Sequence, residues 1–364
     1  MMSTRGRRFA RAGLGLAALL AVACSAGSAA RGGVGAGEAG ASGAAAAATG
    51  TGAAGAGSAA AAPLPVRSAF TTISVSTAPW WMAADGGYFR EQGLDTELIH
   101  VDAGAALLAA LQNNELDVTG GGGPSILYGY LAGIDTVIIG SVMNTLDANV
   151  MVRPEIQTVD DLRGKTIGVS RLKAISDVGA RLAFKKAGLE PDVDVFTRGT
   201  GGNAETLAAM EAGTVDGASF GVGMALEAQK RGYREMFNLG RMGIPFLQGA
   251  VSSTRRVLSE RPEIAERVLR AMAQAMSRLR TDREFGLAVL MKYTQSDDRE
   301  LLGATLDYYR PLYPVDPYPD PAALQAVIDA EEHPKARETR PEDLLDLRFA
   351  EQLRASGFLD TLPQ

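Results

Sequence analysis

The sequence predicts an α/β protein made of two similar parallel-sheet lobes. One observation behind this class is that β-branched, strand-like runs alternate with Ala- and Leu-rich helical stretches, an order typical of parallel sheets. The other is that this pattern occurs twice, with matching segments 94 to 99 residues apart. A repeat in the same order along the chain indicates an internal duplication.

Three pairs of segments carry the duplication. They are Thr72–Ser76 with Thr166–Ser170, Phe89–Asp95 with Phe184–Glu190, and Leu108–Asp117 with Leu207–Asp216. Their shared order and slowly drifting spacing indicate a common structure rather than chance. Each copy is therefore expected to be one small α/β unit of the same design.

Each copy predicts a strand, a helix, a strand, a helix and a strand. The first helices end at Gly93 and Gly188, and the second at Asn114 and Gly213, residue types that tolerate a left-handed backbone. The strands are expected at 72–76, 97–101 and 116–119 in the first copy and at 166–170, 193–197 and 215–219 in the second. From about Ser259 onward the chain is expected to be helical, with a long amphipathic helix from Pro262.

Composition excludes several functional classes. The 364 residues are 46% hydrophobic and 21% charged, with a formal net charge of −6, which is an ordinary globular balance. Nucleic-acid binding is not expected, because it favours a clustered basic face. The single Cys excludes an intrachain disulfide and a Cys-based zinc site. Two His leave little for a metal centre or a His-dependent hydrolase, and no cofactor or catalytic residue is expected.

The N-terminus has the layout of an export signal. Four Arg precede the apolar run Leu14–Val22, which is shorter than the ~20 residues of a transmembrane helix. Residues 1–23 are predicted to be the signal peptide, and Cys24 directly after it the lipid-modified residue of a lipoprotein. Conventional cleavage after Ala23 is the alternative. Residues 24–65 are mostly Gly, Ala, Ser and Thr, which predicts a flexible linker.

Two segments resemble a known family. Ala78–Leu98, APWWMAADGGYFREQGLDTEL, resembles the N-terminal signature of the nitrate/sulfonate/taurine-type substrate-binding proteins of ABC importers. Val159–Val169, VDDLRGKTIGV, is similar to the segment that opens the second lobe of those proteins, and Leu207–Asp216 is similar to the element that closes its cleft. The resemblance runs from about Val66 to the C-terminus. It departs at Asn114, where the usual residue is Gly, and at 170–173, where many members have small residues.

The resemblance implies a periplasmic binding protein fold of type II. Lobe I would consist of residues 66–149 and 246–364, and lobe II of residues 150–245. The chain would cross between the lobes near 148–153 and 243–250, and these two segments would form a two-strand hinge. Hinge motion would then close the two lobes on a small molecule.

The resemblance also implies the function of a solute-binding component of an ABC importer. Such a protein would capture a small anionic or aromatic organic molecule and deliver it to a permease with a cytoplasmic ATPase. We expect a monomer in the periplasm or on the outer face of the membrane, anchored through Cys24. Two alternatives stay open: an enzyme on the same scaffold, similar to the thiamine-pyrimidine synthases, or a tethered sensor without a permease.

Candidate ligand-binding residues follow the carboxyl ends of the predicted strands, where open α/β sheets bind ligands. They are Thr77, Trp80, Trp81, Gly122, Gly123, Pro124, Ser125, Arg171, Ser176, Asn203 and Gly221. Trp80, nearer the loop than Trp81, is expected to offer a platform for an aromatic or apolar ligand. Arg171 could bind a carboxylate or sulfonate with both guanidinium nitrogens.

Each of these groups also has a purely structural interpretation. The two Trp could be core residues. The run Gly120–Gly123 could bind an anion through backbone N–H groups at the start of a helix, or could serve only to let the lobes approach. Ser176 and Asn203 could cap helices.

Overall fold

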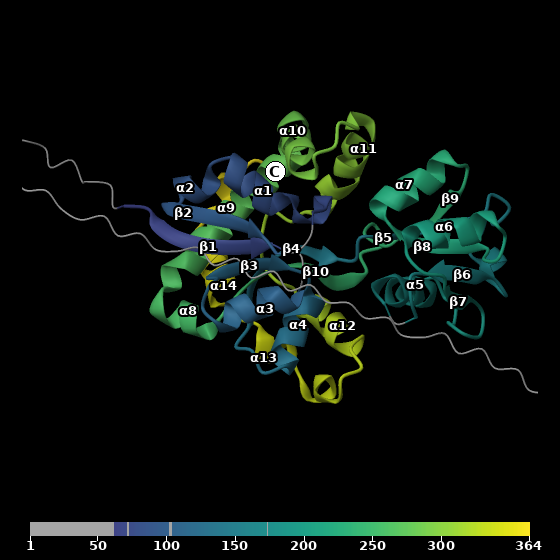
Figure 1. Ribbon diagram of the computed structural model, residues 1–364, viewed down its shortest axis with the longest axis horizontal. Helices are drawn as coiled ribbons and strands as arrows, with labels where there is room; N and C mark the ends of the chain where they lie inside the picture. The colour runs from purple at the N-terminus through teal and green to yellow at the C-terminus, as the bar shows by residue number, and fades with distance from the viewer. Residues whose placement is uncertain (1–61, 71–72, 102–103, 173) are drawn as a thin grey trace, which may run out of the picture. The chain divides into compact units, whose positions relative to one another are not determined.

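The computed structural model describes residues 62–70, 73–101, 104–172 and 174–364. The predicted signal peptide, Cys24 and nearly all of the predicted linker lie outside these residues. Two five-stranded sheets organise the described part of the chain, and Figure 1 shows them as two lobes.

The first sheet has the strand order β2-β1-β3-β10-β4. Its strands are β1 (Leu64–Phe70), β2 (Leu94–His100), β3 (Val118–Gly121), β4 (Val137–Thr145) and β10 (Pro245–Ser253). Strand β1 is parallel to β2 and β3, whereas β10 is antiparallel to β3 and β4.

The second sheet has the strand order β7-β6-β8-β5-β9. Its strands are β5 (Ala148–Val152), β6 (Thr166–Val169), β7 (Phe196–Gly199), β8 (Gly217–Gly221) and β9 (Arg234–Asn238). Strand β6 is parallel to β7 and β8, and β5 is antiparallel to β8 and β9. The predicted pair of α/β lobes is confirmed, but the sheets are mixed rather than purely parallel.

The antiparallel strands follow from the way the chain crosses between the sheets. It leaves the first sheet after Thr145 and enters the second at Ala148, and it returns between Asn238 and Pro245. The parallel strands of each sheet run toward the other lobe, so a strand that arrives from that lobe must run the opposite way. The crossings at 146–147 and 239–244 begin slightly before the expected ranges, and the predicted lobe limits at 150 and 245 remain predictions.

The first predicted strand is wrong. The described residues 73–76 of this segment do not form it, because β1 lies at Leu64–Phe70 and Val75–Thr77 form a short 3₁₀ helix, η1. The register shows the true correspondence, since Arg67 pairs with Glu97 as Thr166 pairs with Phe196. Equivalent residues of these strands are therefore 99 apart. The β-branched run at 72–76 matched β6 in sequence, but pairing with β2 and β3 selected the preceding segment.

The predicted left-handed positions are confirmed. Gly93 and Gly188 have φ of 69° and 83°, and Asn114 and Gly213 have φ of 61° and 78°. Asn is among the few residues other than Gly that adopt this conformation readily. The replacement of the family's usual Gly by Asn114 thus leaves the turn intact.

Helices cover both sheets. In chain order they are α1 (Ala78–Asp85), α2 (Tyr88–Glu91), α3 (Gly104–Gln112), α4 (Gly123–Leu131), α5 (Ile175–Lys186), α6 (Asn203–Glu211), α7 (Val222–Lys230), α8 (Arg255–Glu260), α9 (Pro262–Thr281), α10 (Arg283–Thr294), α11 (Arg299–Tyr309), α12 (Pro321–Asp329), α13 (Pro341–Leu344) and α14 (Arg348–Ala355). The expected amphipathic helix is α9, whose apolar face is buried in the core of the first lobe. Within the described residues, none of these helices is both long and apolar enough to span a membrane.

In each copy, an Asp carboxylate accepts a hydrogen bond from a backbone N–H of the first strand. Asp117 accepts a hydrogen bond from the backbone N–H of Arg67 at 2.8 Å, and Asp216 accepts one from the N–H of Thr166 at 2.9 Å. These acids are 99 residues apart, as the strands are. Asp117 is only 3% exposed and also pairs with the guanidinium groups of Arg67 and Arg261.

We predict that replacing Asp117 with Ala lowers the free energy of unfolding by about 2–3 kcal/mol, because several charged hydrogen bonds to a buried acceptor are lost. Asp216→Ala is the matched control. Its carboxylate is 31% exposed, so its loss should cost about 1 kcal/mol. Urea unfolding of both variants measures the two losses in the free energy of unfolding. Equal losses would contradict the larger contribution assigned to Asp117.

Candidate functional site

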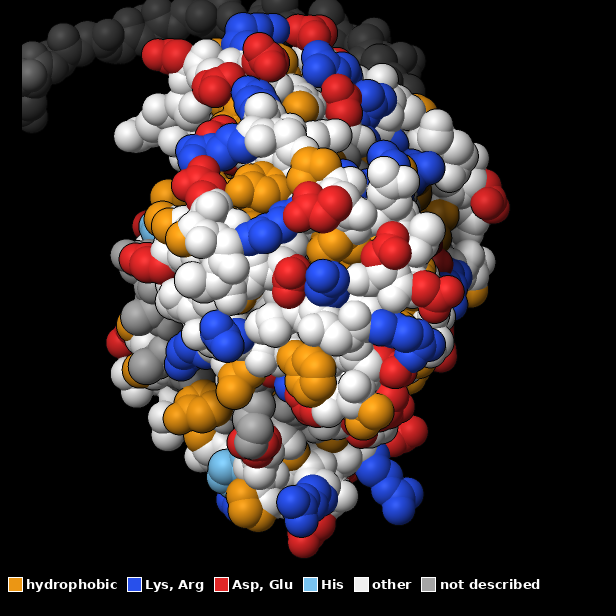
Figure 2. All heavy atoms as spheres, turned by 90° about the vertical axis from the view of Figure 1, so that its right-hand side faces the viewer, with side chains coloured by type: hydrophobic (Ala, Val, Ile, Leu, Met, Phe, Trp, Pro, Cys, Tyr) orange, Lys and Arg blue, Asp and Glu red, His pale blue; other side chains and the backbone are white. Residues whose placement is uncertain are grey.

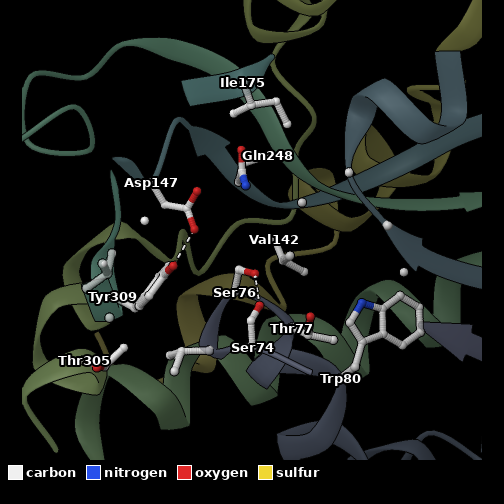
Figure 3. Close-up of a pocket in the computed structure, with 18 of the residues that line it drawn as sticks. Ser74, Ser76, Thr77, Trp80, Val142, Asp147, Ile175, Gln248, Thr305 and Tyr309 are labelled. Carbon is white, nitrogen blue, oxygen red and sulfur yellow. Dashed lines mark hydrogen bonds between the residues drawn. The ribbon is translucent and has the colours of Figure 1, made fainter. Parts of the chain in front are cut away.

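A cavity of about 610 Å³ lies between the two lobes. The first lobe contributes η1, the start of α1, the end of β3, the start of α4, and parts of β4, β10, α10 and α11. The second lobe contributes the starts of α5, α6 and α7. This volume is typical of a site for a small organic molecule, and Figure 3 shows part of its lining.

Two equivalent helices begin at the cavity without a capping side chain. Helix α4 follows Gly122 and helix α7 follows Gly221, residues that are 99 apart and both line the cavity. The first N–H groups of a helix have no partner within it and carry partial positive charge. A glycine before the helix supplies no side chain to compete for them. Both lobes therefore offer backbone donors to an acceptor group.

Trp80 lines the cavity, whereas Trp81 does not. Trp81 is fully buried and stacks on Tyr293, with ring centroids 4.9 Å apart and planes 4° apart. Successive helical residues point about 100° apart, so one side chain faces the core when the other reaches the cavity. Trp80 is itself only 1% exposed, so little of its indole is accessible from the cavity.

The indole of Trp80 also explains why residue 120 is a glycine. A Cβ added at Gly120 would lie 2.3 Å from Nε1 of Trp80. Gly123 is likewise needed for packing, because its Cβ would lie 2.6 Å from the carbonyl oxygen of Leu247, and it does not line the cavity. The structural interpretation therefore holds for part of the run Gly120–Gly123.

The expected cation is missing from the cavity lining. Arg171 is exposed in the turn after β6, and Lys173 lies outside the described residues. Ser176 does not line the cavity either. Its Oγ accepts a hydrogen bond from the backbone N–H of Ser170 at 3.1 Å and contacts the Ser170 hydroxyl at 2.9 Å. This turn presents Ile175 to the cavity instead.

The structure brings seven of the eleven candidate residues to the cavity. They are Thr77, Trp80, Gly122, Pro124, Ser125, Asn203 and Gly221. Trp81, Gly123, Arg171 and Ser176 lie elsewhere. Cys24, the predicted lipidation site, lies outside the described residues.

Sequence reasoning missed the acidic group of the site. Asp147 lies in the first crossing and lines the cavity, and its Oδ2 accepts a hydrogen bond from the hydroxyl of Tyr309 on α11. Burial raises the pKa of Asp147 to about 6, against the lowering effect of that hydrogen bond. A signal existed, because Asp147 is the only charged residue in the apolar run from 137 to 152.

The side-chain charge of the cavity is negative or zero. Among the described residues that line it, none is Lys, Arg or His, and Asp147 is the only carboxylic acid. Burial and the neighbouring carboxylate raise the pKa of Tyr309, so the phenol stays neutral. The two histidines are used elsewhere: His100 stacks on Phe70 at 5.1 Å, and Nδ1 of His333 accepts from the N–H of Lys335.

Two mixed α/β lobes connected by two crossings, with a cavity between them, define the periplasmic binding protein fold. The chain belongs to the NMT1/THI5-like family, whose model matches residues 74–283. The family-level prediction from the sequence is therefore confirmed. No curated protein sequence matches the chain significantly.

Solved structures share the fold at low sequence identity. A putative sulfonate-binding protein SsuA of Methylobacillus flagellatus KT has a TM-score of 0.65 at 16% identity, covering 83% of this chain and 98% of its own. The aliphatic sulphonate binding protein SsuA of Escherichia coli has 0.61 at 20%, covering 78% and 99%. The nitrate-binding protein NrtA of Synechocystis PCC 6803 has 0.59 at 11%, covering 83% and 92%.

We predict that Gly120→Ala displaces Trp80 and lowers the free energy of unfolding by about 1–3 kcal/mol, as overpacking does. Gly221→Ala is the control. A Cβ there meets nothing within 4 Å, so the change should stay within about 0.5 kcal/mol. Because Trp80 and Trp81 are the only tryptophans, their fluorescence reports the displacement. An unchanged spectrum and stability in Gly120→Ala would contradict the contact.

Proposed function

We propose that this protein is the solute-binding component of an ABC importer. One observation carries the proposal: residues from both lobes line a single cavity, together with Asp147 of the first crossing between them. A ligand that touches both lobes binds the closed arrangement better than the open one, and it therefore shifts the population toward closure. The permease, with its cytoplasmic ATPase, would recognise the closed, ligand-bound protein and receive the ligand from it.

The ligand is a small organic molecule. The capless starts of α4 and α7 favour a group that accepts hydrogen bonds, such as a carboxylate or sulfonate. Trp80 and Val142 give the lining an apolar part that suits an aliphatic or aromatic body. An anionic group would be held by neutral donors, the backbone N–H groups and the hydroxyl and amide side chains of the lining, because Arg171 lies outside the cavity.

Binding without turnover fits the cavity better than catalysis. An enzyme similar to the thiamine-pyrimidine synthases would draw on His and metal-binding groups. Neither His100 nor His333 lines the cavity, and the described residues contain no group of three or more His, Cys, Asp or Glu placed to hold a metal ion. We therefore propose a receptor, without a catalytic residue or cofactor.

The N-terminal region supplies the location. We propose that residues 1–23 direct export, that Cys24 carries a lipid, and that residues 24–65 tether a monomeric receptor in the periplasm or at the outer face of the membrane. A tethered sensor would share all of these features. Co-purification of a permease with the loaded receptor would separate the importer from the sensor.

We predict saturable binding of one ligand molecule per chain with no chemical change in it. A thermal-shift screen finds the ligand, because binding to the folded state alone raises the melting temperature. Calorimetry then gives the stoichiometry, and chromatography of the recovered ligand tests for turnover. A converted product would contradict the receptor and favour the enzyme.

We predict that Cys24→Ser abolishes membrane attachment while leaving export intact, because the lipid can be added only to the thiol. Fractionation and incorporation of labelled fatty acid measure this. Ser25→Ala is the matched control and should remain membrane-bound. A Cys24→Ser protein that stays in the membrane fraction would contradict the anchor.

A further inference from the structure

We propose that the ligand carries a cationic nitrogen, an ammonium or amidinium group, which binds the carboxylate of Asp147. Asp147 would then be a specificity-determining residue that favours cationic and zwitterionic molecules over purely anionic ones. The inference rests on the proposed function, because it assigns ligand chemistry to the same cavity.

The geometry leaves Asp147 with unused acceptor capacity. A carboxylate can accept about four hydrogen bonds. Tyr309 donates to Oδ2, and the only other hydrogen bond that acts on the carboxylate among the described residues comes from its own backbone N–H, which leaves acceptor capacity on the group. Figure 3 shows the two side chains together at one side of the cavity, with Trp80 at the other. A ligand that extends from Trp80 toward Asp147 would bring its end group to this carboxylate.

The surroundings of Asp147 do not neutralise its charge. The Asp147 carboxylate acts on the phenols of Tyr308, Tyr309 and Tyr313, whose pKa values are all raised, so they are uncharged. Among the described residues, no cation contributes to the pKa of Asp147 itself. Glu235 and Arg241 are the charged groups that act on Tyr308 from the side of β9 and the second crossing. A carboxylate largely removed from water without a cation is destabilised. A ligand cation would supply the missing partner.

A second acceptor in the same wall lacks a donor. Gln248 on β10 lines the cavity, and its Oε1 is buried with no hydrogen-bond partner among the described residues. Buried acceptors are normally paired. An ammonium has three donors and an amidinium four, so either could bind Asp147 and still offer N–H groups to other acceptors.

The pH dependence of binding gives the sign of the ligand charge. The pKa of Asp147 is about 6 without ligand, so the carboxylate is ionised at pH 7.5 and mostly protonated at pH 5. An alkylammonium keeps its charge over this range. Its affinity should therefore fall about tenfold from pH 7.5 to pH 5, because part of the binding energy is spent on removing the proton. An anion would show the opposite trend.

The test is a thermal-shift screen of the full mature chain with compounds matched in carbon skeleton. One set is benzylamine, 4-(aminomethyl)benzoate and benzoate, and the other is propylamine, 3-aminopropane-1-sulfonate and propane-1-sulfonate, each extended with larger members of the same charge class. Hits are titrated by calorimetry at pH 5 and pH 7.5. Asp147→Asn is compared with Asp95→Asn, whose side chain is exposed on β2.

The proposal expects hits among the amines or the zwitterionic compounds of the screen. Their affinity should be about 10- to 100-fold weaker for Asp147→Asn and unchanged for Asp95→Asn. If Asp147→Asn melts at a much lower temperature without ligand, the variant is destabilised, and the pH dependence of ligand affinity in the unaltered chain then decides whether the proposal holds. Hits confined to the anions, or affinity independent of pH and of Asp147, would overturn the inference and leave the receptor standing. A screen in which no charge class binds would contradict the receptor and the inference together.

Discussion

The structure depends on the double crossing of the chain between its two sheets. Because the chain enters each sheet from the other lobe, β5 and β10 must run against the parallel strands, and both lobes must present their strand ends to the same space. Two adjacent residues of α11 hold these crossings. Tyr309 donates to Asp147 in the first, and Tyr308 donates to Asn238 beside the second at 3.0 Å. Helix α11 therefore connects the hinge to the cavity wall.

The duplication places similar groups on the two sides of the cavity, but the two sides differ in chemistry. The α4 and α7 helix starts are equivalent, and both offer backbone donors. The acid of the cavity has no counterpart in the repeat, because Asp147 belongs to a crossing rather than to either copy. The backbone donors of the cavity thus belong to the repeated unit, whereas its carboxylate belongs to the segment that connects the two units.

Much of the fold could be predicted because its signals are local. Gly93, Gly188 and Gly213 adopt the left-handed conformations that their residue type allows, and the order of strands and helices follows from periodicity. The strand β1 could not be placed, since the more β-branched segment beside it matched the repeat better and only tertiary pairing decides between them. The site was predictable where it follows strand ends, as at Gly122 and Asn203. Asp147 and Tyr309 come together only through the crossing and a distant helix, which no local pattern encodes.

The central claim is that one ligand bridges both lobes, and the distance between the lobes tests it most directly. Spin labels at Tyr128→Cys in the first lobe and Leu172→Cys in the second, both exposed positions, would be introduced with Cys24→Ser. Electron–electron double resonance then gives the distance distribution. The account predicts that saturating ligand shifts this distribution to a shorter and narrower population. A distribution that does not change when ligand is bound would contradict it.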